Sequence, residues 1–202
     1  TGNFAQDAGG GIACGTSNGE NPTFKRVVIA NNGAEEWGGG GVYAYNSQPQ
    51  FINCTIVNNT SPNGQVLSTS GGSYPTYNNC IIWSATSTTS LGSGTGEYTI
   101  TYSSVYGFEA GVTDGNGNIG SYPLFTNHNN NDFTLQEGSP CIDAGDPSTE
   151  LDPDGSIVDM GAYYYSQICN DISACNFENE AICLYDDCTG VCDGDAYMDN
   201  CN

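Results

Sequence analysis

The chain has 202 residues, of which 37% are hydrophobic, so it is long enough to bury a core and does not have a disordered composition. It carries 23 acidic residues against only Lys25 and Arg26, and the formal net charge of −21 repels a nucleic acid backbone, which excludes nucleic acid as a partner. No stretch approaches the roughly 18 consecutive apolar residues of a transmembrane helix, so we expect no membrane span.

A short segment occurs three times in the first half of the chain. The copies are TFKRVVIANN at 23–32, QFINCTIVNN at 50–59 and TYNNCIIWS at 76–84. Alternate positions stay apolar in every copy, which is the pattern of a strand with one face buried. We therefore predict one strand per copy, with three apolar columns: Phe24 with Phe51 and Tyr77, Val27 with Cys54 and Cys80, and Ile29 with Ile56 and Ile82.

Turn residues recur on either side of these strands. Glycine clusters precede them at 9–11 and 39–41, and asparagine pairs follow them at 31–32 and 58–59. Glycine permits tight corners, and asparagine tolerates left-handed backbone conformations. Because internal periods of this length are typical of solenoids, we predict an all-β fold, a parallel β-helix whose coils stack about 4.8 Å apart. A β-sandwich is the alternative, but it requires antiparallel hairpins and no such match between columns.

The second half of the chain carries a family resemblance. An alternating strand is expected at 98–107, and the most specific later segments are SPCIDAGDPS at 139–148 and VDMGAYYY at 158–165. These segments resemble the C-terminal part of secreted right-handed parallel β-helix proteins of Bacteroidetes-type bacteria, a family grouped by its variable surface-anchor endings. The resemblance covers most of residues 1–166. It implies that this part closes the last coils, with Pro140 and the aromatic run 163–165 as a cap over the end of the core.

The tail differs in composition from the rest of the chain. Six of the ten cysteines lie between Cys169 and Cys201, among many aspartates, and so many cysteines indicate an oxidising, extracellular compartment. The segment DGDAYMDNC is similar to one arm of a thrombospondin type 3 calcium repeat. We expect two domains, a β-helix at 1–166 and a Cys/Asp-rich module at 167–202 that continues in a longer natural chain.

Calcium is the cofactor that the acidic residues suggest, because it binds hard oxygen ligands and is abundant outside cells. One candidate set lies in the tail and comprises Asp187, Asp193, Asp195 and Asp199. A second set, in DPDGSIVD, comprises Asp152, Asp154 and Asp159, although the resemblance implies a structural turn there. For the first set the alternative is solvated carboxylates on a disulfide-linked module.

Disulfides are expected in both parts of the chain. Stacked coils bring Cys54 and Cys80 within the range of a disulfide, but two buried thiols would pack equally well. The six tail cysteines allow 15 pairings, among which the sequence does not choose; they are Cys169, Cys175, Cys183, Cys188, Cys192 and Cys201.

Enzyme chemistry finds little support in the sequence. A polysaccharide lyase needs a base and cations that neutralise a uronate, but Lys25 and Arg26 are adjacent on a predicted strand and should face opposite sides. The one histidine, His128, lies in a polar segment expected to be a loop, and no carboxylate pair stands out for a hydrolase. We expect a protein that is not an enzyme, with a carbohydrate-active lyase or hydrolase as the alternative.

These observations favour an extracellular structural or adhesive role at a bacterial cell surface. A rigid solenoid can present side chains such as Tyr43, Tyr45, Trp37 and Trp83 to carbohydrate or to other surface proteins. It can also self-associate into a filament through its ends and the Cys-rich tail.

Overall fold

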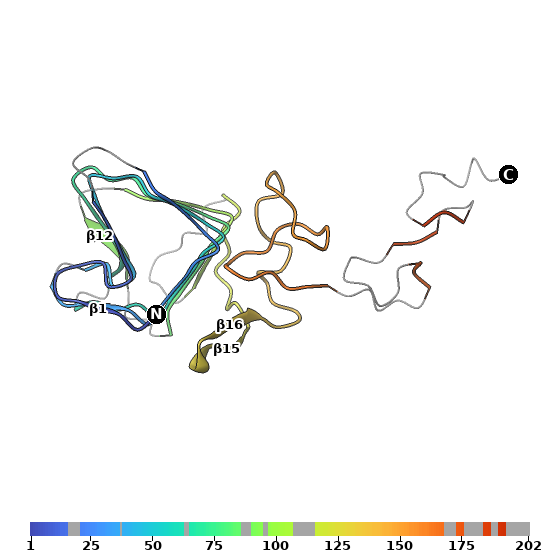
Figure 1. Ribbon diagram of the computed structural model, residues 1–202, viewed down its shortest axis with the longest axis horizontal. Coiled ribbons are helices and arrows are strands. Elements are labelled where there is room, and N and C mark those ends of the chain that lie inside the picture. The colour runs from blue at the N-terminus through green and yellow to red at the C-terminus, as the bar shows by residue number, and fades with distance from the viewer. Residues whose placement is uncertain are drawn as a thin grey trace.

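The chain folds into a parallel solenoid with a triangular cross-section, as Figure 1 shows in a view down the coil axis. This computed structural model describes residues 1–15, 21–36, 38–62, 65–85, 90–94, 97–106, 116–167, 173–175, 184–186 and 190–192. Among them there is one short 3₁₀ helix, η1 (His128–Asn130), and no helix long and apolar enough to cross a membrane.

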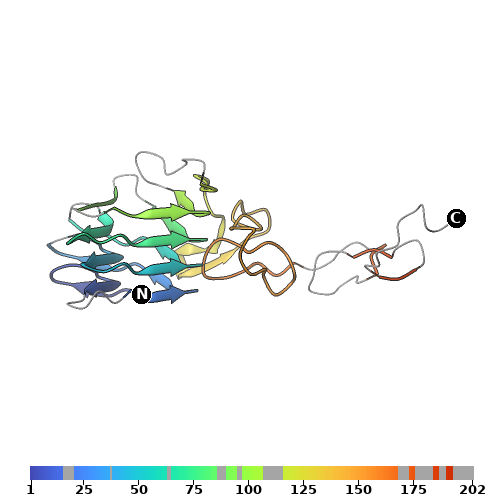
Figure 2. The ribbon, with the colours of Figure 1, turned by 90° about the horizontal axis from the view of Figure 1, so that it is seen from above.

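Three four-stranded parallel sheets form the sides of the triangle, and their strands stack one coil above another in Figure 2. The first sheet contains β2 (Ile12–Gly15), β6 (Val42–Tyr45), β9 (Gln65–Ser70) and β12 (Ser90–Gly94). The second contains β3 (Thr23–Lys25), β7 (Gln50–Ile52), β10 (Thr76–Asn78) and β13 (Thr99–Thr101). The third contains β4 (Val28–Ala30), β8 (Thr55–Val57), β11 (Ile81–Trp83) and β14 (Ser104–Tyr106). A short parallel pair, β1 (Phe4–Ala5) with β5 (Gly33–Ala34), lies beside them.

The register of these sheets confirms the predicted columns and the parallel β-helix. Phe51 pairs with Phe24 on one side and Tyr77 on the other, and the stacked rings are 4.9 Å apart at both contacts. Ile56 lies in the same way between Ile29 and Ile82. These columns form the interior core, and because neighbouring coils pair in parallel, the solenoid is not a β-sandwich.

The prediction of one strand per copy of the short segment is wrong, because each copy forms two strands that meet at a corner. Arg26, Asn53, Asn79 and Tyr102 occupy equivalent positions between the second and third sheets, and their φ angles lie between 47° and 53°. This left-handed conformation ends the strand and turns the chain onto the next side of the triangle. The alternation of faces therefore does not continue from Lys25 to Arg26.

The predicted glycine and asparagine corners are confirmed, and the asparagines also form a buried ladder. A Cβ atom on Gly40 would lie 2.1 Å from the carbonyl oxygen of Thr60, so only glycine allows the coils to approach there. Asn32 donates its backbone N–H to Oδ1 of Asn59 over 2.9 Å, and Asn59 donates Nδ2–H to the carbonyl of Ile29 over 2.8 Å. One side chain per coil thus satisfies backbone groups in the coils around it.

The C-terminal part, 121–165, does not cap the end of the solenoid as the resemblance implied. It packs along the outer face of the third sheet and includes the antiparallel hairpin of β15 (Phe125–Asn127) and β16 (Asp132–Leu135) (Figure 2). Tyr163 and Tyr164 of the expected cap are 46% and 36% exposed. We call 121–165 the docking segment.

A second core explains why the docking segment lies there. Most outward positions of the third sheet are apolar and include Ala30, Val57, Ile81 and Trp83, whereas Thr55 and Ser104 on the same face are buried polar residues. The apolar ones pack against apolar side chains of the docking segment, among them Phe125, Phe133, Leu135 and Met160. A sheet that is apolar on both faces must be covered on both, and burial of this apolar area stabilises the lateral arrangement.

Candidate ligand-binding groove

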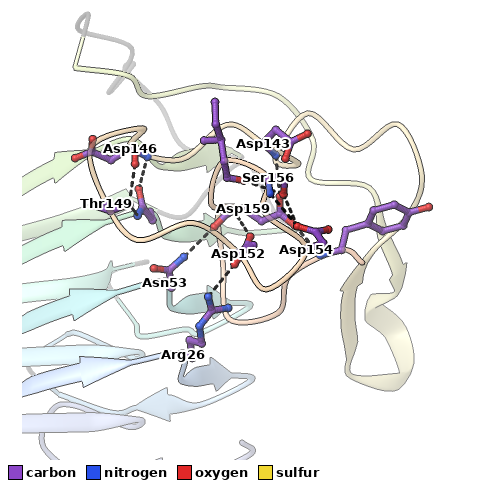
Figure 3. A network of polar contacts seen from close by, with 12 residues as sticks. Arg26, Asn53, Asp143, Asp146, Thr149, Asp152, Asp154, Ser156 and Asp159 are labelled. Carbon is purple, nitrogen blue, oxygen red and sulfur yellow. Dashed lines mark hydrogen bonds and ion pairs between the residues drawn. The ribbon is translucent and has the colours of Figure 1, made fainter. Parts of the chain in front are cut away.

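Two of the three candidate calcium ligands in the docking segment are tied to other parts of the structure (Figure 3). Asp152 accepts from Arg26 Nη2 at 2.9 Å through one oxygen and from the backbone N–H of Asp159 at 2.7 Å through the other. Asp159 accepts backbone N–H groups from Asp143 at 2.7 Å and from Tyr165 at 2.6 Å. Both carboxylates therefore connect strand corners and turns of the chain.

The third carboxylate, that of Asp154, is held in a similar way. One oxygen accepts from the hydroxyl and the N–H of Ser156, at 2.7 and 3.1 Å, and the other accepts from the N–H of Gln167 at 3.0 Å. Burial opposes ionisation of Asp154, but these hydrogen bonds outweigh it and lower the pKa of the carboxyl group. Burial, with the nearby charges of Asp152 and Asp143, raises the pKa of Asp159 to about 6 despite its two amide donors.

This geometry gives the three aspartates a structural role. Each of their six carboxylate oxygens accepts a hydrogen bond from a protein donor, which does the work that a cation would otherwise do. A calcium ion takes 6–8 oxygen ligands that converge on one point, and among the described residues these three carboxylates do not bring three ligand atoms within 4.8 Å of one another. The residues thus fit calcium poorly, and calcium binding at Asp152, Asp154 and Asp159 stays a prediction.

The tail is described only in short pieces, which contain one disulfide. It joins Cys175 to Cys192, with 5.7 Å between the Cα atoms, and Asp186 lies beside it. The other predicted tail residues lie outside the described residues, so their calcium and disulfide roles stay predictions; they are Asp187, Asp193, Asp195, Asp199, Cys169, Cys183, Cys188 and Cys201.

Cys54 and Cys80 are free, buried thiols in the structure, which corresponds to the second of the two alternatives left open for them. Cys54 donates its backbone N–H to Sγ of Cys80 over 3.5 Å, and Cys80 donates its own to Oγ of Ser103 over 2.9 Å. Cys54, Cys80 and Ser103 thus form a second ladder of hydrogen bonds, at the corner between the second and third sheets. Burial raises the pKa of the Cys80 thiol well above its ordinary value. A disulfide between the two cysteines stays a hypothesis for an oxidised protein.

A groove of about 540 Å³ opens where the docking segment meets the corner between the second and third sheets. Lys25 and Arg26 line the groove from the corner of the first coil, and Glu150 and Leu151 line it from the docking segment. The lining also includes three asparagines at this corner in the later coils: Asn53, Asn78 and Asn79. The expectation that Lys25 and Arg26 face opposite sides is wrong, because the positive φ of Arg26 brings both side chains to one groove. The asparagines aligned with Arg26 were the sequence signal for this corner, since asparagine favours that conformation.

The remaining basic or aromatic candidates do not form a site with the groove. His128 lies in η1 rather than in an irregular loop, and its ring is 4.9 Å from that of Trp83. Trp83 is only 3% exposed beneath the docking segment, so it is not a displayed side chain. Tyr45 is 53% exposed and Tyr43 is half-buried on the first sheet, whereas Trp37 lies outside the described residues.

Comparison with protein-family models, curated proteins and solved structures finds no match to this chain. The fold and the groove are therefore the basis of any functional argument. They define the class of protein as an all-β solenoid with parallel strands and a C-terminal disulfide.

Proposed function

We propose that the protein is an extracellular, non-catalytic structural or adhesive module of a bacterial cell surface. The observation that carries the proposal is the use of its charged groups. In the docking segment, Asp152, Asp154 and Asp159 hold backbone amides and Arg26 rather than converging on open space. These three carboxylates and Arg26 thus stabilise the structure, which suits a rigid scaffold that displays its surface.

The proposal includes assembly into a filament through the β-helix ends and the Cys-rich tail, with calcium in the tail as a cofactor. Two molecules with a net charge of −21 repel each other, so contact between copies requires screening or a bound cation. Electron microscopy of the native protein, with calcium and with a chelator, tests this assembly. We expect regular fibres that fray on chelation, whereas short single rods under both conditions would leave only the adhesive role.

Adhesion is tested separately by binding of the labelled protein to intact bacterial cells and to immobilised polysaccharides. We expect saturable binding that survives heating to a temperature below the unfolding transition and disappears above it. If neither cells nor polysaccharides are bound and no fibres form, the proposed function is wrong.

A second candidate function, a polysaccharide lyase or hydrolase, is favoured by one observation. Lys25 and Glu150 line the same groove, so a base and an acid are both available there. Incubation with acidic polysaccharides, followed by assays for new reducing ends and for unsaturated products, separates the two functions. Sustained product formation that Lys25→Gln abolishes would establish the enzyme and refute the non-catalytic proposal.

A further inference from the structure

We propose that the groove binds an acidic saccharide, a pyranose unit that bears one anionic group, and that Lys25 is the residue that recognises the charge. This inference rests on the proposed adhesive function, because it gives the surface a class of ligand.

The charge distribution is the first argument. The chain has only two Lys and Arg residues against 23 acidic ones, and both basic residues line this groove. The rest of the molecule repels anions, so the groove is the place in the described structure where an anion meets positive charge. The net charge of −21 does not attract an anion from a distance, but at about 0.15 M salt the charges beyond about 8 Å are largely screened, so an anion in the groove interacts mainly with the charges that line it.

The two cations are not equivalent. Arg26 is bound to Asp152, which neutralises its charge, although its side chain remains 43% exposed and a guanidinium has five N–H donors. Lys25 is exposed, and among the described residues no carboxylate forms an ion pair with it. Lys25 therefore carries the free charge, and Arg26 is a rigid neighbour that can donate further hydrogen bonds.

The rest of the lining favours a sugar over a bare inorganic anion. Ile52, Leu151, Pro153 and Val158 give the groove an apolar surface, and Leu151 is 52% exposed. Asn78 and Thr149 add polar residues to the same lining, and each already donates one internal hydrogen bond, from Asn78 Nδ2 to Thr101 Oγ1 and from Thr149 Oγ1 to the carbonyl of Asp146. A pyranose has an apolar C–H face and hydroxyl groups at its edge, so it matches both kinds of surface.

Size and the one opposing charge complete the argument. The volume of about 540 Å³ lies within the roughly 300–1,000 Å³ of pockets that hold small organic ligands. Glu150 also lines the groove and repels an anion, so affinity is the balance of Lys25 against Glu150. An acidic segment of a second copy is a weaker candidate, because the two copies repel each other.

The test is calorimetric titration of the full chain with trigalacturonate at about 0.15 M salt. Lys25→Gln should weaken binding about tenfold, the value expected for loss of a charged hydrogen bond, while Glu150→Gln should strengthen it. Asn129→Asp is the matched control: like Lys25→Gln it makes the net charge more negative by one, but Asn129 is exposed on η1 and does not line the groove. Opposite effects at Lys25 and Glu150 cannot come from a general loss of folding.

The ligand side of the test uses the methyl ester of trigalacturonate, which keeps the sugar and removes the charge. Esterification should weaken binding to the wild type about tenfold but should not weaken binding to Lys25→Gln, where only the repulsion by Glu150 acts on the anionic group. A sulfated trisaccharide shows whether the anionic group can be a sulfate as well as a carboxylate, and binding of either supports the inference.

Three results would overturn the inference: no binding of either acidic trisaccharide, equal binding of the ester, or equal binding of triglutamate. If these occur while the protein still adheres to cells or forms fibres, the inference fails and the proposed function stands. If trigalacturonate is bound and then cleaved, the ligand class stands and the non-catalytic proposal fails.

Discussion

Truncation of Phe51 tests whether the stacked interior column holds the solenoid together. Phe51 is fully buried, and its ring lies between those of Phe24 and Tyr77, with both centroid distances at 4.9 Å. Replacement of a buried Phe by Ala costs about 3–5 kcal/mol, and two aromatic contacts of about 0.5–1.5 kcal/mol each place Phe51→Ala near the upper end. We therefore expect a loss of about 5 kcal/mol in the free energy of unfolding.

The assay is equilibrium unfolding in urea, followed by circular dichroism, with hydrogen exchange to locate the damage. Protection should fall first in the coils on either side of Phe51, because a solenoid contacts mainly its neighbouring coils. Tyr45→Ala is the matched control, since it also removes an aromatic ring but at a side chain that is 53% exposed; we expect about 0.5 kcal/mol or less. Equal losses for the two variants, or a loss below about 1 kcal/mol for Phe51→Ala, would refute the reasoning.

Three further predictions concern buried polar groups. Asn59→Ala leaves the buried backbone N–H of Asn32 without the acceptor that Asn59 provides and removes one donor from the carbonyl of Ile29, so it should cost about 1–3 kcal/mol in a urea titration. An unchanged midpoint would contradict the ladder. In a carbon-13 NMR titration, the pKa of Asp159 should be about 6 rather than 3.8. The stability that its protonation provides is therefore fully present below about pH 3.8 and is lost as the pH rises through 6, and Asp159→Asn should remove this pH dependence of the free energy of unfolding. Burial raises the pKa of Cys141 to about 11, so its thiol should resist alkylation at pH 8 in the folded protein and react once urea unfolds the chain. The stability linked to the neutral thiol should fall as the pH rises from 9 through 11. Rapid alkylation of the folded protein would contradict the burial of Cys141.

The candidate groove was not predictable from the alternation of residues. Lys25 and Arg26 are adjacent, and in a continuous strand they would face opposite sides. The left-handed corner at Arg26 brings them together, and Leu151 and Glu150 join them from a segment more than a hundred residues away. The aspartates at 152, 154 and 159 looked like metal ligands because carboxylate spacing is visible in a sequence, whereas the N–H groups that meet them are not.

The repeat by itself determined the parallel β-helix, its register and its interior columns. The physical reason is that side-chain alternation and corner-forming Gly and Asn are local properties, and stacking repeats them from coil to coil. Only the tertiary structure decided where the docking segment lies, because the apolar outer face of the third sheet matches a surface distant in sequence. The Arg26–Asp152 ion pair spans 126 positions, and it exists because two surfaces pack, not because any local pattern encodes it.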